Sequence, residues 1–292
     1  MAKSRILFIA PLPPPVHGSA MVSQYIKDSQ LLQSQCDCDF VNLSTSRRMD
    51  EIGKGGAKKL FRFVGSYFAV LFKLLTRRYD LCYLAITCHG MGFLKDAPFV
   101  LLCKLFGRKV LIHQHNKGMS RYVDRWPYRW LLPLVYRHTK VMLLSWHLYD
   151  DISRVVHRDQ VVICPNGIPQ QGNVGPLPNP LHTTPSAPHL LFLSNLIPSK
   201  GVYVLLDACR MLHEQGLSFV CDFVGGETKE IDRATFDAAV KERGLEGIAR
   251  YQGPKYGEEK ERCFAEADIF VFPTFYYNEC FPLVLLEAMQ YR

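Results

Sequence analysis

Two glutamates near the end of the chain, Glu279 and Glu287, have the chemistry and the spacing to hold hydroxyl groups. They stand in the stretch N-E-C-F-P-L-V-L-L-E-A-M, directly after an apolar run at residues 268–273. An ionised carboxylate only accepts hydrogen bonds, so it suits the hydroxyls of a sugar or a ribose, which are donors. The alternative is that one glutamate is a solvated loop residue and the other lies on a helix surface.

A strand, a loop and a helix are expected to position these carboxylates. The apolar run at 268–273 predicts a strand, and Pro282 has the fixed φ that suits the first position of a helix over 282–291. Glu279 would then lie on a loop at the carboxyl end of a strand, and Glu287 about one and a half turns into the helix. In open α/β sheets this edge is where ligands bind.

A lysine stands at the start of another predicted helix. Residues 189–194 read as a strand and 201–214 as a helix, with Lys200 where the helix begins and Ser199 as its predicted N-cap. A helix N-terminus beside a lysine favours an anion such as phosphate. A cation for phosphates and two carboxylates for hydroxyls together suit a nucleotide-diphosphate sugar.

These segments resemble the donor half of a family-4 retaining glycosyltransferase of the GT-B fold. The match rests on F-L-S-N-L-I-P-S-K-G at 192–201 and on the E-x7-E element with L-L-E-A-M at 279–289. Two further markers are R-I-L-F-I-A-P-L-P-P-P-V-H-G-S-A at 5–20 and V-I-C-P-N-G-I at 162–168. The resemblance covers most of the chain. It implies an α/β protein of two Rossmann-like, doubly wound domains.

The resemblance implies a role for each residue at the donor phosphates. Lys200 would bind the diphosphate together with an arginine, but Asn195 stands where family members usually carry that arginine. A neutral donor contributes about 1 kcal/mol less than a charged one, so we expect weaker phosphate binding. Pro282 has no N–H to offer, so the amides of Phe281 and Leu283 would have to serve the phosphates.

The glutamates have separate roles in the resembled family. Glu279 would contact donor-sugar hydroxyls close to the reacting carbon, and Glu287 would bind the ribose hydroxyls. The resemblance does not settle whether a residue such as Glu279 is a nucleophile. Front-face substitution, with the leaving phosphate assisting deprotonation of the acceptor, is the usual proposal for such enzymes.

The first half of the chain offers candidates of its own. In V-L-I-H-Q-H-N-K-G, His115 is the preferred equivalent of a family histidine that faces the donor sugar, and His113 is the alternative. Either could instead be a structural histidine at a strand end. Gly18 follows the first predicted strand and would let the backbone approach a ligand, with His17 beside it. The alternative for Gly18 is an ordinary strand-to-helix turn.

No metal or cofactor is expected. The H-x-H spacing lacks an evident third ligand, and the ten cysteines form no C-x-x-C pair. Asp37-Cys38-Asp39 spells D-x-D, which is a metal–nucleotide motif in another glycosyltransferase fold. It precedes a predicted strand far from the donor segments, so we interpret Asp37 and Asp39 as solvated turn residues.

Charge divides the chain into unlike halves. Residues 1–165 carry 24 Lys+Arg and 11 Asp+Glu, and residues 166–292 carry 11 and 16, which gives +13 and −5. Two basic segments rich in aromatic residues, 54–78 and 121–137, suit an anionic membrane surface. The alternative is two packing helices with solvated faces. Nucleic-acid binding is disfavoured because no recognition motif accompanies the charge.

The domain organisation follows from composition and periodicity. Residues 1–165 are expected to form an acceptor domain, 166–188 a Pro/Gly-rich linker, and 189–292 an incomplete nucleotide-sugar domain. The predicted strands are Arg5–Ala10, Asp39–Leu43, Leu81–Leu84, Lys109–His113, Val141–Leu144, Val161–Cys164, 189–194, 218–224, 249–252 and 268–273. The predicted helices lie near 19–34, 57–76, 92–106, 122–137, 146–156, 201–214, 230–243, 257–267 and 282–291.

We therefore expect a metal-independent, hexosyltransferase-like enzyme of polysaccharide biosynthesis. It would take a nucleotide-diphosphate sugar and a glycan or lipid-linked acceptor. It would work in the cytoplasm, with peripheral contact to the inner face of the plasma membrane. No secretory signal and no run of 18 apolar residues is present in the sequence. The last predicted helix has no C-cap, so the chain resembles a truncated family member. Two alternatives stay open: an inactive domain that only binds nucleotide or membrane, and a sugar-nucleotide epimerase.

Overall fold

The computed structural model describes residues 3–44, 57–170 and 187–291. The chain divides into two compact units. Unit 1 comprises residues 1–169 together with 278–283, and unit 2 comprises residues 170–277 and 284–292. Most of the predicted linker, residues 171–186, lies outside the described residues.

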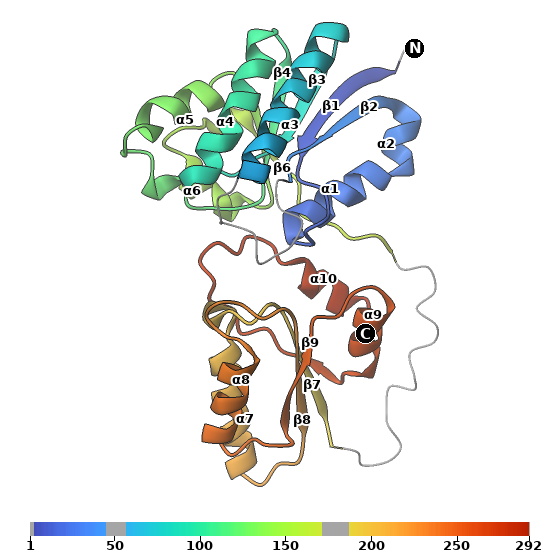
Figure 1. Cartoon of the computed structure of the whole chain (residues 1–292), viewed down its shortest axis with the longest axis vertical. Coiled ribbons are helices and arrows are strands. Elements are labelled where there is room, and N and C mark those ends of the chain that lie inside the picture. The colour runs from blue at the N-terminus through green and yellow to red at the C-terminus, as the bar shows by residue number, and fades with distance from the viewer. Residues whose placement is uncertain (1–2, 45–56, 171–186, 292) are drawn as a thin grey trace. The chain divides into compact units, whose positions relative to one another are not determined.

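Unit 1 is built on a six-stranded parallel sheet with the strand order β2-β1-β3-β4-β5-β6 (Figure 1). The strands are β1 (Ser4–Ala10), β2 (Cys36–Asn42), β3 (Leu81–Ala85), β4 (Lys109–Gln114), β5 (Lys140–Leu143) and β6 (Val161–Ile163). Strands β2 and β3 pair with opposite sides of β1, so the strand order reverses between β1 and β3.

Helices cover both faces of this sheet. They are α1 (Gly18–Asp28), α2 (Gln30–Gln35), α3 (Ala57–Thr76), α4 (Gly90–Leu105), α5 (Tyr128–Tyr136) and the single turn α6 (Tyr149–Ile152), with 3-10 turns at Met119–Arg121, Trp146–Leu148 and Arg158–Gln160. On one face α3, α4 and α5 enclose the larger core, which contains Val70, Phe93 and Leu132. On the other face α1 and α2 contribute Ile26 and Leu32 to a smaller core.

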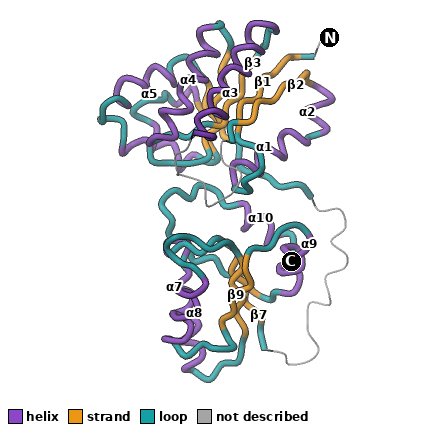
Figure 2. Tube along the Cα trace, viewed as in Figure 1, coloured by secondary structure: helices purple, strands orange, loops and turns teal. Residues whose placement is uncertain are grey.

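Unit 2 repeats the arrangement on a four-stranded parallel sheet, in the order β10-β7-β8-β9. Its strands are β7 (His189–Leu193), β8 (Val220–Val224), β9 (Ala249–Gly253) and β10 (Ile269–Phe270). Its helices are α7 (Val202–Glu214), α8 (Arg233–Glu242), α9 (Glu258–Glu266) and α10 (Leu283–Met289), and a 3-10 turn at Pro198–Lys200 precedes α7. Helices α7 and α8 pack on one face and α9 and α10 on the other (Figure 2). The strand order reverses between β7 and β10.

Two parallel sheets with helices on both faces confirm the expected α/β, doubly wound fold. No helix in the described part of the chain is long and apolar enough to cross a membrane.

Three predicted helices are shorter or broken in the structure. The helix expected over 19–34 is two helices, because Ser29 ends α1 with an extended backbone and its hydroxyl accepts from the Leu32 amide to begin α2. The helix expected over 122–137 begins only after Pro127. The helix expected over 146–156 is a 3-10 turn followed by the single turn α6.

Two predicted strands also have different bounds. Strand β2 begins at Cys36, three residues before its predicted start. The strand expected over 268–273 keeps only Ile269 and Phe270 as β10. The Val271 amide still donates to the Leu191 carbonyl at 2.8 Å. Pairing cannot continue through Pro273, which has no N–H.

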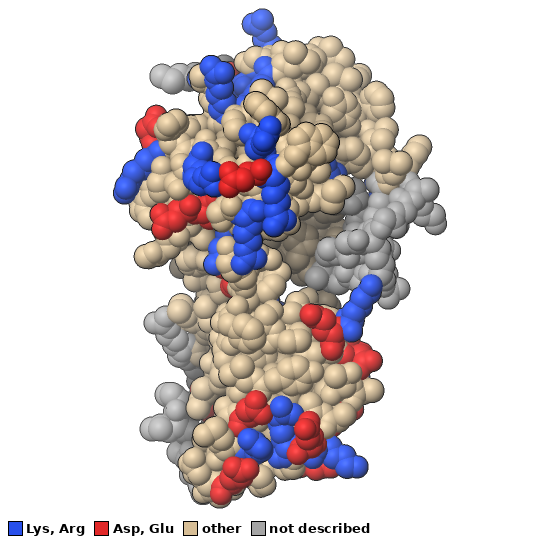
Figure 3. Space-filling view, turned by 90° about the vertical axis from the view of Figure 1, so that its left-hand side faces the viewer, with Lys and Arg blue, Asp and Glu red and all other residues tan. Residues whose placement is uncertain are grey.

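Lys and Arg side chains gather on unit 1. On the face seen in Figure 3, groups of Lys and Arg side chains lie on unit 1 and outnumber the acidic side chains among them, whereas both signs mix over unit 2. This distribution agrees with the net charges of +13 and −5 for the two halves of the sequence.

Candidate functional site

Each unit has a point at the carboxyl edge of its sheet where the strand order reverses. In open α/β sheets ligands bind at such switch points, because the loops diverge there and leave a crevice. In unit 2 the loops after β7 and β10 flank the switch point, and in unit 1 the loops after β1 and β3 flank it. The predicted phosphate residues follow β7, and the first-half candidates follow β1 and β4.

Two backbone features hold the loop after β7 against the loop after β10. The Ser199 carbonyl accepts from the Phe275 amide at 2.9 Å. Gly201 has a φ of 93°, and a Cβ added there would lie 2.3 Å from the Pro273 carbonyl oxygen. Only glycine permits this approach, so Gly201 fixes the start of α7 beside the β10 loop.

Lys200 lies between two aromatic rings at this edge. Its ammonium is 4.7 Å from the centroid of the Tyr276 ring and 5.6 Å from that of Phe272. Cation–π contacts of this kind hold an ammonium in place without neutralising its charge. Lys200 also directly precedes the N-cap of α7, so a positive charge and the positive end of a helix dipole meet at the switch point.

The predicted N-cap is wrong. Gly201, not Ser199, occupies the N-cap position of α7, and no side chain caps it. Ser199 instead lies in the preceding 3-10 turn and contributes its carbonyl to the β10 loop. The N-cap residue of α7 therefore contributes no side-chain oxygen to the start of the helix.

Asn195 ties two loops together. Its Oδ1 accepts from the Gly226 amide of the loop after β8 at 3.1 Å. The adjoining Gly225 has a φ of 153°, and a Cβ there would lie 1.9 Å from the Ser194 carbonyl oxygen. Asn195, which occupies the position expected for an arginine, therefore makes a structural contact through its side-chain oxygen. Its neutral amide nitrogen is the group that can donate a hydrogen bond to a ligand.

The two glutamates belong to different units. Glu287 lies on α10, and its Oε2 is 2.6 Å from Lys260 Nζ on α9, with both side chains mostly buried. This ion pair orients the carboxylate, which retains a second oxygen as an acceptor. Glu279 falls in the segment 278–283 that clusters with unit 1, as does Phe281, whose carbonyl accepts from Asn166 Nδ2 at 2.9 Å. The structure thus groups Lys200 with Glu287 in unit 2 and Glu279 with unit 1.

A pair of neutral histidines lies at the carboxyl end of β4 in unit 1. The rings of His113 and His115 have centroids 4.0 Å apart, and His113 Nδ1 is 2.5 Å from the Tyr83 hydroxyl. Burial lowers the pKa of His113 to about 4. The pKa of His115 is also well below its usual value, because of burial first and then the nearby His113 and His17. At neutral pH these imidazoles are uncharged.

The two histidines differ in what they can reach. His113 is only 3% exposed and lies within the strand, whereas His115 follows the end of β4 and is partly exposed. The Nε2 atoms of both are buried and have no hydrogen-bond partner among the described residues. Buried polar atoms are normally paired, so each is a position where a ligand hydroxyl or a water can bind.

His17 and Gly18 lie at the start of α1. His17 Nδ1 accepts from the Ala20 amide at 3.4 Å, which makes this histidine the N-cap of the helix. Burial lowers the pKa of His17. A Cβ added to Gly18 would meet no atom within 4 Å. No contact within the described chain demands glycine there, and the close approach of a ligand stays a prediction.

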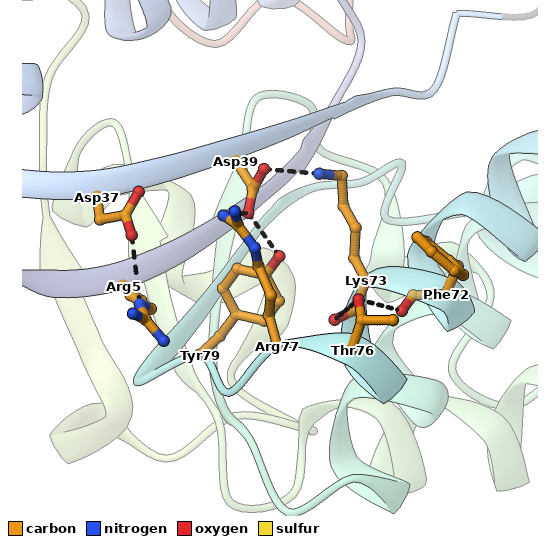
Figure 4. Close-up of polar contacts among 8 residues, drawn as sticks. All are labelled: Arg5, Asp37, Asp39, Phe72, Lys73, Thr76, Arg77 and Tyr79. Carbon is orange, nitrogen blue, oxygen red and sulfur yellow. Dashed lines mark hydrogen bonds and ion pairs between the residues drawn. The ribbon is translucent and has the colours of Figure 1, made fainter.

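The D-x-D segment is a structural ion-pair cluster, so its interpretation as a solvated turn is wrong. Asp39 lies within β2 and receives bonds from Lys73 at 2.6 Å, Tyr79 at 2.6 Å and Arg77 at 3.0 Å (Figure 4). Burial alone would raise the pKa of Asp39, but the bonds from Lys73 and Tyr79 hold it below its usual value. Within the part of the chain that the structure describes, Asp37 pairs only with the exposed Arg5, at 3.3 Å. Within the described ranges, no three or more His, Cys, Asp or Glu residues are grouped so as to hold a metal ion.

Tyr83, which contacts His113, and Tyr276, which contacts Lys200, were not predicted from the sequence. Tyr83 pairs with Leu111 in the β3–β4 register, so it lies on the same sheet face as His113, and strand alternation could have revealed it. Tyr276 belongs to the run F-Y-Y at residues 275–277, in the loop after β10. Its packing on Lys200 depends on the path of the loop, which no periodicity predicts.

The second half of the chain is similar in sequence to known glycosyltransferases. Residues 180–292 match the family Glycosyl transferases group 1. The amylovoran biosynthesis glycosyltransferase AmsK of Erwinia amylovora is 34% identical over 104 residues, which are 34% of this chain and 25% of AmsK. The chain therefore spans well under two thirds of this curated relative.

Solved structures match over nearly the whole chain. The sucrose-phosphate synthase of Thermosynechococcus elongatus has a TM-score of 0.70 at 16% identity, with 98% of this chain and 79% of that chain covered. Anabaena HepE in complex with UDP and glucose has a TM-score of 0.64 at 17% identity, with 99% and 78% covered. At these identities the likeness concerns the fold. The chain has an α/β fold of the GT-B type, and its residues 180–292 match the Glycosyl transferases group 1 family.

Proposed function

We propose that this chain is a retaining glycosyltransferase of family 4. It moves a hexosyl group from a nucleotide-diphosphate sugar to a glycan or lipid-linked acceptor in polysaccharide biosynthesis, without a metal ion. The observation that carries the proposal is the position of Lys200, whose ammonium is held between Tyr276 and Phe272 at the switch point of the group 1 domain.

The donor diphosphate binds at the start of α7. The Lys200 ammonium and the helix N-terminus supply positive charge to the two phosphates. Asn195 adds a neutral donor, and the amides of Phe281 and Leu283 add further ones. When the bond from the anomeric carbon to the phosphate oxygen breaks, negative charge grows on that oxygen, and Lys200 stabilises it.

The hydroxyl groups of the donor are held by carboxylates. Glu287, oriented by Lys260, accepts from the ribose hydroxyls. Glu279 accepts from sugar hydroxyls near the reacting carbon, and the neutral His115 faces the sugar from unit 1. The acceptor, which binds to unit 1 near Gly18, attacks from the face that the phosphate leaves, and the departing phosphate oxygen takes the proton of the acceptor hydroxyl.

The comparisons support this substrate class. AmsK is described as an enzyme of amylovoran biosynthesis, and HepE was solved with UDP and glucose. By analogy, the donor here carries a nucleoside diphosphate and the product is a polysaccharide or its precursor. We place the reaction in the cytoplasm, at the inner face of the plasma membrane, where a lipid-linked acceptor is available.

Nucleotide binding tests the donor site. Calorimetric titration of UDP, GDP and ADP should show binding of at least one, and Lys200→Ala should weaken it about tenfold or more, since a charged hydrogen bond contributes about 1.5–3 kcal/mol. Lys241→Ala, an exposed lysine on α8, is the matched control and should bind as the wild type does. If none of the three nucleotides binds, or if Lys200→Ala binds equally well, the donor site is wrongly assigned.

A turnover assay then separates the proposed reaction from its alternatives. Glu279→Ala and Lys200→Ala should each lower sugar transfer by about tenfold or more, which corresponds to one lost charged contact in the transition state. Binding without any transfer would identify a nucleotide-binding domain. Conversion of the donor sugar to an isomer without an acceptor would identify an epimerase.

A further inference from the structure

We propose that the outward face of α3 in unit 1 is a docking surface for an anionic lipid bilayer. The face is formed by Phe61, Val64, Phe68, Phe72 and Leu75, here called the α3 stripe. The inference concerns a different surface from the donor site and does not depend on the sugar or nucleotide used.

The α3 stripe is apolar, continuous and exposed. Its five residues are between 39% and 81% exposed. At about 100° per residue, they fall within an arc of about 80° along the helix. Large apolar side chains are scattered singly on most surfaces, so a continuous stripe of three phenylalanines, a leucine and a valine marks an interaction surface.

The stripe is not part of the core of unit 1, because a different face of α3 packs on the sheet. Val70 and Leu74 are almost fully buried there. Phe63 and Tyr67 contact Phe99 of α4, with ring centroids 5.5 and 5.9 Å apart. Helix α3 therefore has two apolar faces. One packs in the core of unit 1, and the other, the α3 stripe, is exposed to solvent.

The charge around the stripe selects an anionic partner. Residues 57–78 contain six Lys and Arg and no Asp or Glu. Lys73 and Arg77 form ion pairs with the Asp39 carboxylate, and these contacts fix the C-terminal end of α3 on β2 (Figure 4). Exposed phenylalanines beside cations are the composition of helices that lie in the interface of anionic membranes.

Helix α5, on the same face of the sheet, also exposes apolar side chains beside a cation. On α5, Trp130 and Leu134 are exposed one turn apart, and the Arg129 guanidinium lies 4.9 Å from the centroid of the Trp130 ring. Helices α3, α4 and α5 lie side by side on one face of the sheet (Figure 1). Tryptophan and arginine suit the headgroup level of a bilayer, where one end of a side chain is apolar and the other is wet.

A bilayer fits this surface better than a second copy of the chain does. Pairing two α3 stripes would bring together two segments that each contain six Lys and Arg, and the single Asp39 carboxylate bound to Lys73 and Arg77 offsets only part of that charge. Like charges at an interface disfavour association. An anionic bilayer provides the opposite charge, and its hydrocarbon accepts phenylalanine side chains without a shaped pocket.

Vesicle flotation of the full chain, without nucleotide, tests the proposal. Wild-type protein should float with vesicles of equal parts phosphatidylglycerol and phosphatidylcholine, bind vesicles of phosphatidylcholine alone much less, and lose binding as salt is raised. The double variant Phe68→Ser/Phe72→Ser should bind at least about tenfold more weakly, because burial of one phenylalanine alone contributes more than a tenfold step in affinity.

The matched control is Met211→Ser/Leu217→Ser, which removes two apolar residues of similar exposure from unit 2 and should leave vesicle binding unchanged. Circular dichroism verifies that both double variants fold. Absence of flotation with the anionic vesicles, or equal flotation of the Phe68→Ser/Phe72→Ser variant, would overturn the proposal. The proposal would also be overturned if sedimentation velocity showed a wild-type dimer that the Phe68→Ser/Phe72→Ser substitutions dissociate. The α3 stripe would then be a surface for self-association. Nucleotide titration of the same proteins reports separately on the donor site.

Discussion

Replacing Asp39 by asparagine should destabilise unit 1 far more than the same change two residues earlier. Asp39 accepts from Lys73, Arg77 and Tyr79, whereas Asp37 pairs only with Arg5 at 3.3 Å, and both members of that pair are about half exposed. Both substitutions keep the shape of the side chain and remove one negative charge. Comparing the two variants therefore separates the effect of the Asp39 contacts on stability from the effect of net charge (Figure 4).

The magnitude follows from the three contacts. A hydrogen bond to a charged group contributes about 1 kcal/mol more than a neutral one, so three such bonds give about 3 kcal/mol. The Arg77 side chain is 54% exposed, which screens its contact, so we expect about 2 kcal/mol for Asp39→Asn. For a unit of this size that free energy lowers the melting temperature by about 4–8 °C. Asp37→Asn should cost less than about 0.5 kcal/mol.

The assay can report on unit 1 alone. The chain has three tryptophans, Trp126, Trp130 and Trp146, and all belong to unit 1. Urea unfolding followed by tryptophan emission at neutral pH therefore gives the free energy of unfolding of that unit. If Asp39→Asn lost no more stability than Asp37→Asn, the ion-pair cluster would not be a structural element.

Acid and metal titrations test the same reasoning independently. The folded-state pKa of Asp39 is lowered, so its contribution is present above the unfolded pKa of about 4 and disappears as pH falls through the folded value. The difference between wild type and Asp39→Asn should shrink over that range. If D-x-D bound a metal, Mg2+ or Mn2+ would raise the melting temperature of the wild type and of neither variant. We expect no such rise.

Two further predictions concern the backbone and the histidines. Gly201→Ala should cost at least about 2 kcal/mol and weaken nucleotide binding, because its Cβ would lie 2.3 Å from the Pro273 oxygen, while Gly244→Ala, with φ of 65° and open space around it, should cost about 1 kcal/mol. Both glycines belong to unit 2, which has no tryptophan, so urea unfolding of these variants is followed by far-UV circular dichroism; equal losses would refute the steric argument. The folded-state pKa of His113 is about 4 against 6.5, so stability should fall as pH drops from about 6.5 to 4, by about 3 kcal/mol from this residue, and level off below. His113→Gln should flatten that part of the stability–pH curve measured by urea unfolding, and an unchanged curve would show that folding does not lower the pKa of His113.

The order and type of the larger elements could be predicted from the sequence, because apolar periodicity depends on the face that each element buries. The strands from Arg5, Leu81 and Lys109 and the helix over 57–76 lie where the pattern predicts them. The predicted bounds are wrong where one residue interrupts the apolar periodicity. The Ser29 hydroxyl caps the start of α2 and so divides the helix predicted over 19–34, and the strand predicted over 268–273 ends before Pro273.

The sequence predicted which residue types the candidate site would contain, but it did not predict most of the contacts that these residues make. The lysine before a helix and the carboxylate on another helix are local signals, and the structure places both in unit 2. The ion pair of Glu287 with Lys260 joins two helices whose packing sequence periodicity does not predict. Convergence of Lys200, Glu279 and Glu287 on one ligand stays a prediction, because Glu279 clusters with unit 1.

The two histidines at the carboxyl end of β4 show how burial bears on a choice that sequence leaves open. An H-x-H spacing puts both side chains on the same side of the strand, so alternation alone cannot separate them. The structure buries His113 within the strand and binds its Nδ1 to Tyr83, while His115 lies beyond the strand end with partial exposure. A group that meets a ligand must be reachable, so His115 stays the predicted contact residue. His113 is then the predicted positioning residue: the two ring centroids are 4.0 Å apart, and His113 helps to keep the imidazole of His115 uncharged.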